Sequence, residues 1–242
     1  TGYHHGEASL NAAIVGMAQN FVGSNNVNLF EPNGQFGTRL QGGKDSASER
    51  YIFTQLNKIT RFIFRAEDDP ILTYLDDDGQ SVEPIFYVPI IPMVLVNGVK
   101  GIGTGFSTDI MCYNPQQIID YIKHKLAPTP TPAPAPAPTI NPYYKNFKGT
   151  IQRIGNTDDS ASTAAKYLIK GCYTILDDKK IRITELPVGT WTDDYKKFIE
   201  QLIEPVAKKS DAAGSASASA AAAVQLVKDY NDMSTDAEVD IT

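Results

Sequence analysis

The sequence is poor in cysteine, in tryptophan and in long apolar runs. Its 242 residues include two cysteines and one tryptophan. Cys112 and Cys172 have no CxxC spacing and no neighbouring histidine cluster, which is typical of reduced core thiols in an intracellular protein. The longest apolar run, 87–96, contains two prolines and is shorter than the roughly 18 residues of a membrane span. No signal peptide is visible, and both ends read as interior sequence, so we expect a piece of a larger protein.

An excess of positive charge is also missing. The net charge is −6, which argues against a generally basic nucleic-acid binder. The charge is unevenly distributed, however, because residues 1–65 carry six Lys/Arg against four Asp/Glu. We therefore expect any surface for a polyanion in this first third, where His4 and His5 can add charge.

Apolar periodicity predicts four helices. They cover residues 7–20, 51–64, 114–126 and 191–206. Thr192 is the expected N-cap of the last helix, and two aspartates follow it in the first turn. Helices, short strands and glycine turns in this order, within roughly the first 90 residues, suit a winged-helix DNA-binding domain.

Strand signals are concentrated in the second half. Alternating apolar positions between 143 and 187 predict an antiparallel sheet. The segment 82–98 is β-rich, but its prolines favour edge or bulged strands, and 27–30 is a possible short strand. A Pro/Ala tract at 127–139 reads as an extended spacer, and a Ser/Ala tract at 210–223 as a flexible insertion.

One dipeptide raises a chemical question. Arg50 and Tyr51 follow a loop of glycines, small residues and charges, "GGKDSASERYIFT". A phenol is a weak nucleophile at neutral pH, because its pKa is about 10. It becomes useful if a neighbouring cation stabilises charge on the group that it attacks, and a guanidinium does this well for a phosphate. Most tyrosines are nevertheless packing residues, and the dipeptide alone does not separate the two interpretations.

Three further features are ambiguous when taken alone. "GQFGTRLQGGKD" is either a phosphate-cradling loop or a turn. Ile102, flanked by glycines in "GVKGIGTGFS", is either displayed or buried in a glycine-rich turn. The run Asp76–Asp78 lacks a second carboxylate group at a helpful spacing, so a solvated turn is preferred to a metal site.

Several long motifs in order carry a family resemblance. They are "YHHGEASLNAAIVGMAQNFVGSNN", "GQFGTRLQGGKDSASERYIF", "YVPIIPMVLVNGVKGIGTGFS", "FKGTIQRIG", "IRITELPVGTWTDDYKKFIEQL" and "VKDYNDMSTDAEVDI". Together they resemble the DNA breakage-reunion core of eukaryotic-type type IIA DNA topoisomerases. The resemblance covers nearly the whole chain except the two low-complexity tracts.

The resemblance implies roles for individual residues. Tyr51 would attack a backbone phosphorus and become linked to the 5′ end of a broken strand. Arg50 and His5 would stabilise the charge that develops on the phosphate. Ile102 would wedge between base pairs and bend the duplex. Further DNA contacts are expected from Lys44, Arg39, His4, Gln19 and Asn20. His4 has orientation of its loop as an alternative role, and Gln19 and Asn20 have a helix C-terminus as theirs.

The resemblance also implies an α+β architecture and partners. A winged-helix part, 1–90, would precede a tower-like α/β part, 91–242, that flanks the DNA. The whole enzyme would be an ATP-dependent homodimeric isomerase that acts on double-stranded DNA, in the nucleus or at a viral replication site. Its ATP and Mg²⁺ would bind outside this segment, so no metal ligand is expected here.

Two other functions compete with this one. A non-catalytic winged-helix DNA-binding module would share the fold without the covalent chemistry. A tyrosine recombinase-like strand transferase needs several arginines and a histidine around one phosphate and a late tyrosine, whereas Tyr51 is early. The sequence also departs from the family pattern. Glu49 stands where a small residue or proline is usual, and we expect it to point away or to pair with Lys44 or Lys58. Phe106 stands where tryptophan is usual.

Overall fold

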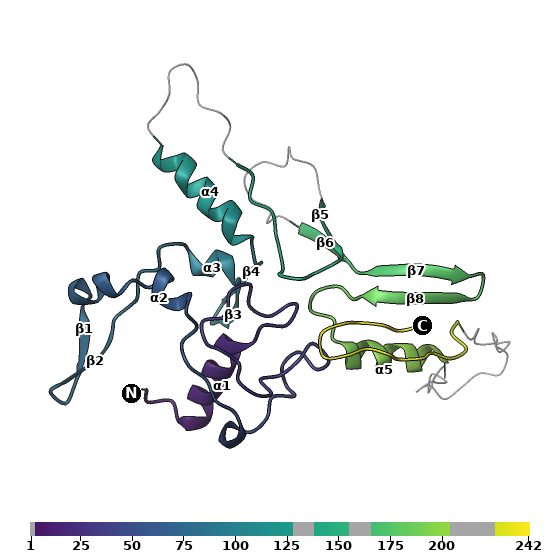
Figure 1. The fold of residues 1–242 in the computed structure, drawn as a ribbon, viewed down its shortest axis with the longest axis horizontal. Coiled ribbons are helices and arrows are strands. Elements are labelled where there is room, and N and C mark those ends of the chain that lie inside the picture. Colours follow the sequence, from purple (N-terminus) through teal and green to yellow (C-terminus); the bar gives the residue numbers. More distant parts are fainter. Residues whose placement is uncertain (1–2, 128–137, 155–165, 204–225) are drawn as a thin grey trace, which may run out of the picture.

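A computed structural model describes residues 3–127, 138–154, 166–203 and 226–242 (Figure 1). The predicted insertion at 210–223 lies outside the described residues, as does nearly all of the predicted spacer at 127–139. In chain order the elements are α1 (Glu7–Ala18), η1 (Glu49–Tyr51), α2 (Thr60–Ile63), η2 (Ala66–Ile71), β1 (Tyr74–Asp77), β2 (Gln80–Pro84), α3 (Met93–Val96), β3 (Val99–Gly103), β4 (Phe106–Ile110), α4 (Pro115–Leu126), β5 (Thr150–Ile154), β6 (Lys166–Lys170), β7 (Cys172–Asp177), β8 (Lys180–Glu185) and α5 (Thr192–Ile203).

Three of the four predicted helices are present as α1, α4 and α5. The start of α4 is set locally, because the Asn114 side chain accepts a hydrogen bond from the Gln116 N–H at 2.9 Å and Pro115 occupies the first turn. The start of α5, in contrast, has no local side-chain cap. Thr192 is the first helical residue rather than the cap, and its buried hydroxyl has no hydrogen-bond partner among the described residues, so the predicted N-cap is wrong.

The predicted helix over 51–64 is also wrong, because only Thr60–Ile63 is α-helical. The preceding residues form isolated bridges with the segment before them. Phe53 and Asn33 exchange both backbone hydrogen bonds, at 3.0 and 3.1 Å, and Leu56 pairs with Phe30. The expected strand over 27–30 is reduced to this last bridge. Tertiary pairing has therefore overridden the helical spacing of the apolar residues.

The strands form four separate antiparallel pairs, β1–β2, β3–β4, β5–β6 and β7–β8. The single sheet expected between 143 and 187 is thus two hairpins, β5–β6 and β7–β8, which join through Gly171 without pairing to each other. The segment 82–98 ends one strand, β2, and then forms α3 instead of an edge strand. The architecture is mixed helix and strand with small antiparallel sheets.

Two apolar clusters form the core. One contains Leu186, Ile199, Val239 and Ile241, where β8, α5 and the C-terminal segment meet. The other contains Ile91, Val96 and Ile118, between α3 and α4. Figure 1 shows β7, β8, α5 and the C-terminal segment gathered at one end of the molecule, away from β1 and β2. Within the described part of the chain, no helix combines the length and apolarity that crossing a bilayer requires.

A buried asparagine joins distant segments. The Asn26 side chain is 6% exposed. Its amide nitrogen donates to the carbonyls of Val96, Tyr113 and Tyr143, and its oxygen accepts from the Lys145 N–H at 2.8 Å. A buried polar group needs such partners, and here the partners come from both sides of α4. Asn26 therefore holds the region before Tyr51 against the segments that flank β3–β4 and α4.

Candidate functional site

Tyr51 ends a short 3-10 turn that projects from the molecule. Its backbone N–H donates to the Ser48 carbonyl at 3.0 Å, and its side chain is 72% exposed. Arg50, the preceding residue, is exposed as well. Neither the phenol nor the guanidinium hydrogen-bonds to another described residue, so both groups can meet a ligand from solvent. A packing role for the Tyr51 ring is excluded by its exposure.

The loop before this turn is tightly folded. The Asp45 carboxylate accepts from the Thr38 N–H at 2.9 Å and from the Thr38 hydroxyl at 2.6 Å. Gly37 has a φ of +97°, and a Cβ there would lie 2.6 Å from the Gly43 Cα. A glycine is therefore required at position 37, where the backbone of the loop crosses itself at Gly43. Ala47 N–H donates to the Gln35 carbonyl at 2.9 Å and closes the loop just before Tyr51.

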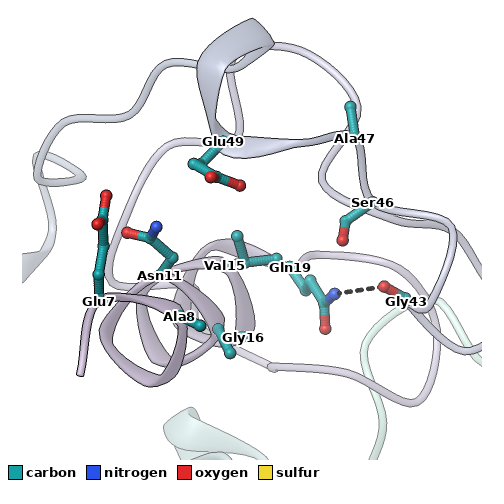
Figure 2. A pocket seen from close by; sticks show the side chains of 11 residues that line it. Glu7, Ala8, Asn11, Val15, Gly16, Gln19, Gly43, Ser46, Ala47 and Glu49 are labelled. Atoms are coloured by element: carbon teal, nitrogen blue, oxygen red, sulfur yellow. Dashed lines mark hydrogen bonds between the residues drawn. The ribbon is translucent and has the colours of Figure 1, made fainter. Parts of the chain in front are cut away.

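A groove runs between α1 and this loop (Figure 2). Glu7 and Asn11 line it from α1, and Ser46 and Glu49 line it from the opposite side. Glu49 accepts a 3.3 Å hydrogen bond from the Ser48 hydroxyl. Among the described residues it forms no ion pair, so the expected pairing with Lys44 or Lys58 is wrong. Its carboxylate faces the groove, which makes this side of the turn acidic.

The two histidines lie in the exposed segment before α1. His5 is exposed, and its ring meets Tyr3 edge-on at a centroid distance of 5.4 Å. His4 is exposed too, and its Nε2 lies 3.5 Å from the Asp77 carboxylate. DNA contact and orientation of its loop both stay predictions for His4, and no described contact joins His5 to Tyr51. Of the run Asp76–Asp78, the first two residues end β1 and Asp78 begins the turn to β2, where the Asp76 side chain accepts from the Gly79 N–H at 2.9 Å.

Arg39 and Gln19 are turned inward. The Arg39 residue is 5% exposed and forms an ion pair with Glu185, so the predicted DNA-backbone contact is corrected. The Gln19 amide nitrogen donates to the carbonyls of Phe36, at 2.9 Å, and Gly43, at 3.3 Å. Gln19 thus acts as part of the α1 C-terminus and the loop, which was its alternative role. Asn20 and Lys44 are exposed.

Ile102 lies on a hairpin rather than in a glycine turn. It belongs to β3, where it pairs with Ser107 of β4, and it is 91% exposed. Phe106, which begins β4, is 84% exposed. The buried-isoleucine alternative is therefore wrong. In the register of β3–β4, Ile102 lies opposite Ser107 and Phe106 lies opposite Gly103, so these two exposed apolar residues lie on opposite faces of the hairpin.

Sequence reasoning missed the residues that hold the tyrosine loop. Glu185 contacts Arg39, and Trp191 lies against Gly42, where a Cβ would overlap the indole. The only available signals were the single tryptophan and the paired glycines, which do not identify each other. Within 3–127, 138–154, 166–203 and 226–242, no group of three His, Cys, Asp or Glu side chains could hold a metal ion. The described residues therefore do not fit a magnesium site.

Known proteins resemble the chain along its length. The family model for the A-type subunit of DNA gyrase/topoisomerase IV matches residues 1–242. DNA topoisomerase 2 of Arabidopsis thaliana is 52% identical over 200 residues, which is 83% of this chain and 13% of the relative. DNA topoisomerase 2 of Pisum sativum is 44% identical over 239 residues, which is 99% of this chain and 15% of the relative. The chain thus spans about one seventh of these relatives.

A solved structure matches the fold. The crystal structure of the Plasmodium falciparum topoisomerase II DNA-binding, cleavage and re-ligation domain superposes with a TM-score of 0.81 at 43% sequence identity. The match covers 100% of this chain and 29% of that one. Since the family model spans every residue and the solved structure has the same fold, the chain belongs to the DNA gyrase/topoisomerase IV family of DNA-cleaving proteins.

Proposed function

We propose that the chain is a segment of an ATP-dependent type II DNA topoisomerase, in which Tyr51 breaks and rejoins DNA. The observation that carries this proposal is the exposed Tyr51–Arg50 pair on a tightly folded loop, in a chain that matches a DNA-cleavage domain along its whole length. The phenolic oxygen attacks a backbone phosphorus and loses its proton. A Tyr–O–P bond forms to the 5′ phosphate, and the P–O bond to the 3′ oxygen breaks.

The surroundings of Tyr51 support this chemistry. Arg50 has no competing carboxylate among the described residues, so its guanidinium is free to pair with the non-bridging oxygens of the phosphate. His5, which is exposed in the segment before α1, is proposed to donate a hydrogen bond to the same phosphate. The phosphotyrosyl ester retains the energy of the broken bond, and the 3′ hydroxyl can therefore attack it and restore the strand without a separate energy source.

The DNA is proposed to lie across the exposed basic and apolar groups. Lys44 and Asn20 contact the backbone, with His4 as a weaker contact through its loop. Ile102 enters the base stack from β3–β4. Unstacking costs a few kcal/mol, which the contacts of a bent duplex offset. Arg39 and Gln19 are not among these proposed DNA contacts, because Arg39 forms an ion pair and Gln19 a hydrogen bond within the protein.

The remaining assignments concern the whole enzyme. We infer that residues 1–90 are part of a winged-helix domain and that 91–242 form a tower-like part beside the DNA. The enzyme is a homodimer, so that two tyrosines open both strands of a duplex and a second duplex passes through. Mg²⁺ and ATP are bound by segments outside this chain. The relatives named above come from plants, which favours the nucleus over a viral replication site.

The test is the covalent adduct. The full-length enzyme is incubated with duplex DNA and Mg²⁺ and quenched with detergent, and protein is then sought on the 5′ ends. We expect an adduct with the native enzyme and none with Tyr51→Phe, while DNA binding by the variant stays within about twofold, because the phenyl ring is retained. Adduct formation by the Phe variant would refute the site. DNA binding without any adduct in the native enzyme would favour the non-catalytic module.

A further inference from the structure

We propose that Arg39 and Glu185 are positioning residues for Tyr51, and that the C-terminal part of the chain holds the tyrosine loop in its reactive place. The inference rests on the proposed function, because it concerns the same covalent step. It assigns to Arg39 a contact within the protein, whereas the sequence predicted a contact with DNA. Its basis is a set of contacts between the loop 36–43 and three C-terminal elements: β8, the start of α5 and residues 236–241.

The centre of this junction is a buried ion pair. Arg39 is 5% exposed and Glu185 is 2% exposed. The Glu185 carboxylate also accepts from the N–H groups of Leu186, at 3.0 Å, and Lys148, at 3.2 Å. The other guanidinium nitrogen of Arg39 donates to the Ala237 carbonyl at 3.4 Å. A buried charge pair persists only when its remaining donors and acceptors are satisfied in this way.

The backbone of the loop caps a helix at the same place. The first N–H groups of α5 lack partners within the helix, and the Thr192 side chain does not supply one. Instead, Thr192 N–H donates to the Arg39 carbonyl at 3.4 Å, and Asp193 N–H donates to the Leu40 carbonyl at 3.1 Å. Carbonyl oxygens of the loop thus meet the partial positive charge of the α5 N-terminus. Loop and helix can hold this geometry only together.

The indole of Trp191 supports the next residues. A Cβ at Gly42 would overlap the ring, and a Cβ at Gly23 would lie 3.3 Å from its Cη2. Phe21 meets the same ring edge-on, at a centroid distance of 5.8 Å. The only tryptophan of the chain therefore lies just before α5 and packs against the loop itself and against the segment around Phe21.

The loop transmits this anchorage to the tyrosine. Thr38, next to Arg39, is bound by Asp45, and its carbonyl accepts from the Gly43 N–H at 2.9 Å. From Asp45 the chain runs to Ala47, which is bound to the Gln35 carbonyl, and then directly into the turn that carries Tyr51. A displacement of Arg39 therefore moves the phenol relative to the phosphate. A misplacement of about 1 Å in such a reaction costs about 10²-fold in rate.

The experiment separates positioning from DNA contact in the full-length enzyme. It compares Arg39→Met and Glu185→Gln with Lys44→Met, an exposed lysine of the same loop. The matched control is Arg182→Met. Arg182 lies on β8, as Glu185 does, and it forms an ion pair with Asp240 at 2.6 Å instead of a contact with the loop. Two quantities are measured on the folded fraction: the dissociation constant for duplex DNA at several salt concentrations, and the single-turnover rate of adduct formation at saturating DNA.

We expect Arg39→Met and Glu185→Gln to slow adduct formation by about 10- to 100-fold, with DNA affinity and its salt dependence unchanged. Arg182→Met should match the native enzyme in both quantities. Lys44→Met should weaken binding and reduce the salt slope by about one unit. The double variant Arg39→Met/Glu185→Leu removes both charges together, and it should react at least about threefold faster than Arg39→Met alone.

Other outcomes overturn the inference. If Arg39→Met behaves like Lys44→Met while Glu185→Gln has no effect, Arg39 contacts DNA directly. If the two variants are merely less stable and react at the native rate per folded molecule, the junction is structural only. If Arg39→Met does not fold, Glu185→Gln and the double variant decide by the same measurements. A native enzyme that forms no adduct would instead refute the proposed function, which keeps the two failures apart.

Discussion

At the scale of single residues, burial separates the two thiols. Cys112 is buried, and its Sγ lies 3.0 Å from the Asn97 carbonyl, to which the thiol donates. Burial raises the pKa of Cys112 to about 11, because desolvation disfavours the thiolate. Cys172 is half-buried, at the start of β7. Since the thiolate is the reactive form, Cys112 is chemically inert near neutral pH.

This difference predicts the order of alkylation. At pH 8 about one Cys112 side chain in a thousand is ionised, so iodoacetamide should label Cys172 first in the native enzyme. Labelling of Cys112 should accelerate about tenfold per pH unit and level off only near pH 11. Peptide mass mapping of timed samples measures both sites, and Cys172→Ser serves as the control. Equal labelling at pH 8 would show that Cys112 is accessible and ionised.

Single residues also show how much of a site can be predicted from the sequence. Tyr51 and Arg50 are both exposed, and their catalytic role stays a prediction. Arg39 and Lys44 lie in one loop and look alike in sequence. The partner that buries Arg39 is Glu185, 146 positions away, and no local pattern links the two. Residue type predicts a cation, whereas a distant carboxylate decides whether that cation is buried or exposed.

At the scale of elements, local signals succeeded where the stabilising contacts are local. Asn114 and Pro115 lie next to each other and start α4 as predicted. The segment after Tyr51 has helical spacing of its apolar residues, yet its backbone pairs with residues near Asn33. The helix α5 carries its two aspartates in the first turn as expected, but its cap comes from the carbonyls of Arg39 and Leu40. Contacts between separated segments were therefore the part that local pattern could not supply.

The contact of the loop with α5 makes a prediction about one glycine. Gly42 has a φ of +65° and lies against Trp191, whereas Gly105 has a φ of +78° and open space around it. Gly105→Ala should cost about 1 kcal/mol, the penalty of a left-handed backbone alone. Gly42→Ala should cost at least about 2 kcal/mol more, because the indole must move. Thermal unfolding of both variants measures the difference, and equal losses would mean that Trp191 does not depend on Gly42.

At the scale of the whole molecule, few buried groups hold many small elements together. The four hairpins are separate two-stranded pairs, and an isolated hairpin is marginally stable in water. Their arrangement depends on long-range contacts such as those of Asn26 and Arg39. Asn26 bonds segments up to 119 positions away, and all of its side-chain partners are backbone groups. It therefore stabilises the relative placement of segments rather than any single element.

Loss of the Asn26 side chain should be costly. Asn26→Ala leaves three carbonyls and one N–H without their partner, and we expect a loss of about 2–4 kcal/mol in the free energy of unfolding. Asn28→Ala is the matched control, because that amide donates only to the nearby Phe30 carbonyl at 2.8 Å, and its loss should be about 1 kcal/mol or less. Denaturant titration distinguishes them. If Asn28→Ala loses as much unfolding free energy as Asn26→Ala, the long-range contacts of Asn26 have no special role in stability.

The separation along the chain between Arg39 and its acceptors also determines when these contacts can form during synthesis. The ribosome makes the tyrosine loop first, and the Ala237 carbonyl that Arg39 binds is translated 198 residues later. At about 5–20 residues per second this delay is roughly 10–40 s. The nascent chain can therefore present a phenol and a guanidinium well before they are set for attack. The contact between Arg39 and the Ala237 carbonyl can therefore form only after residue 237 has been translated.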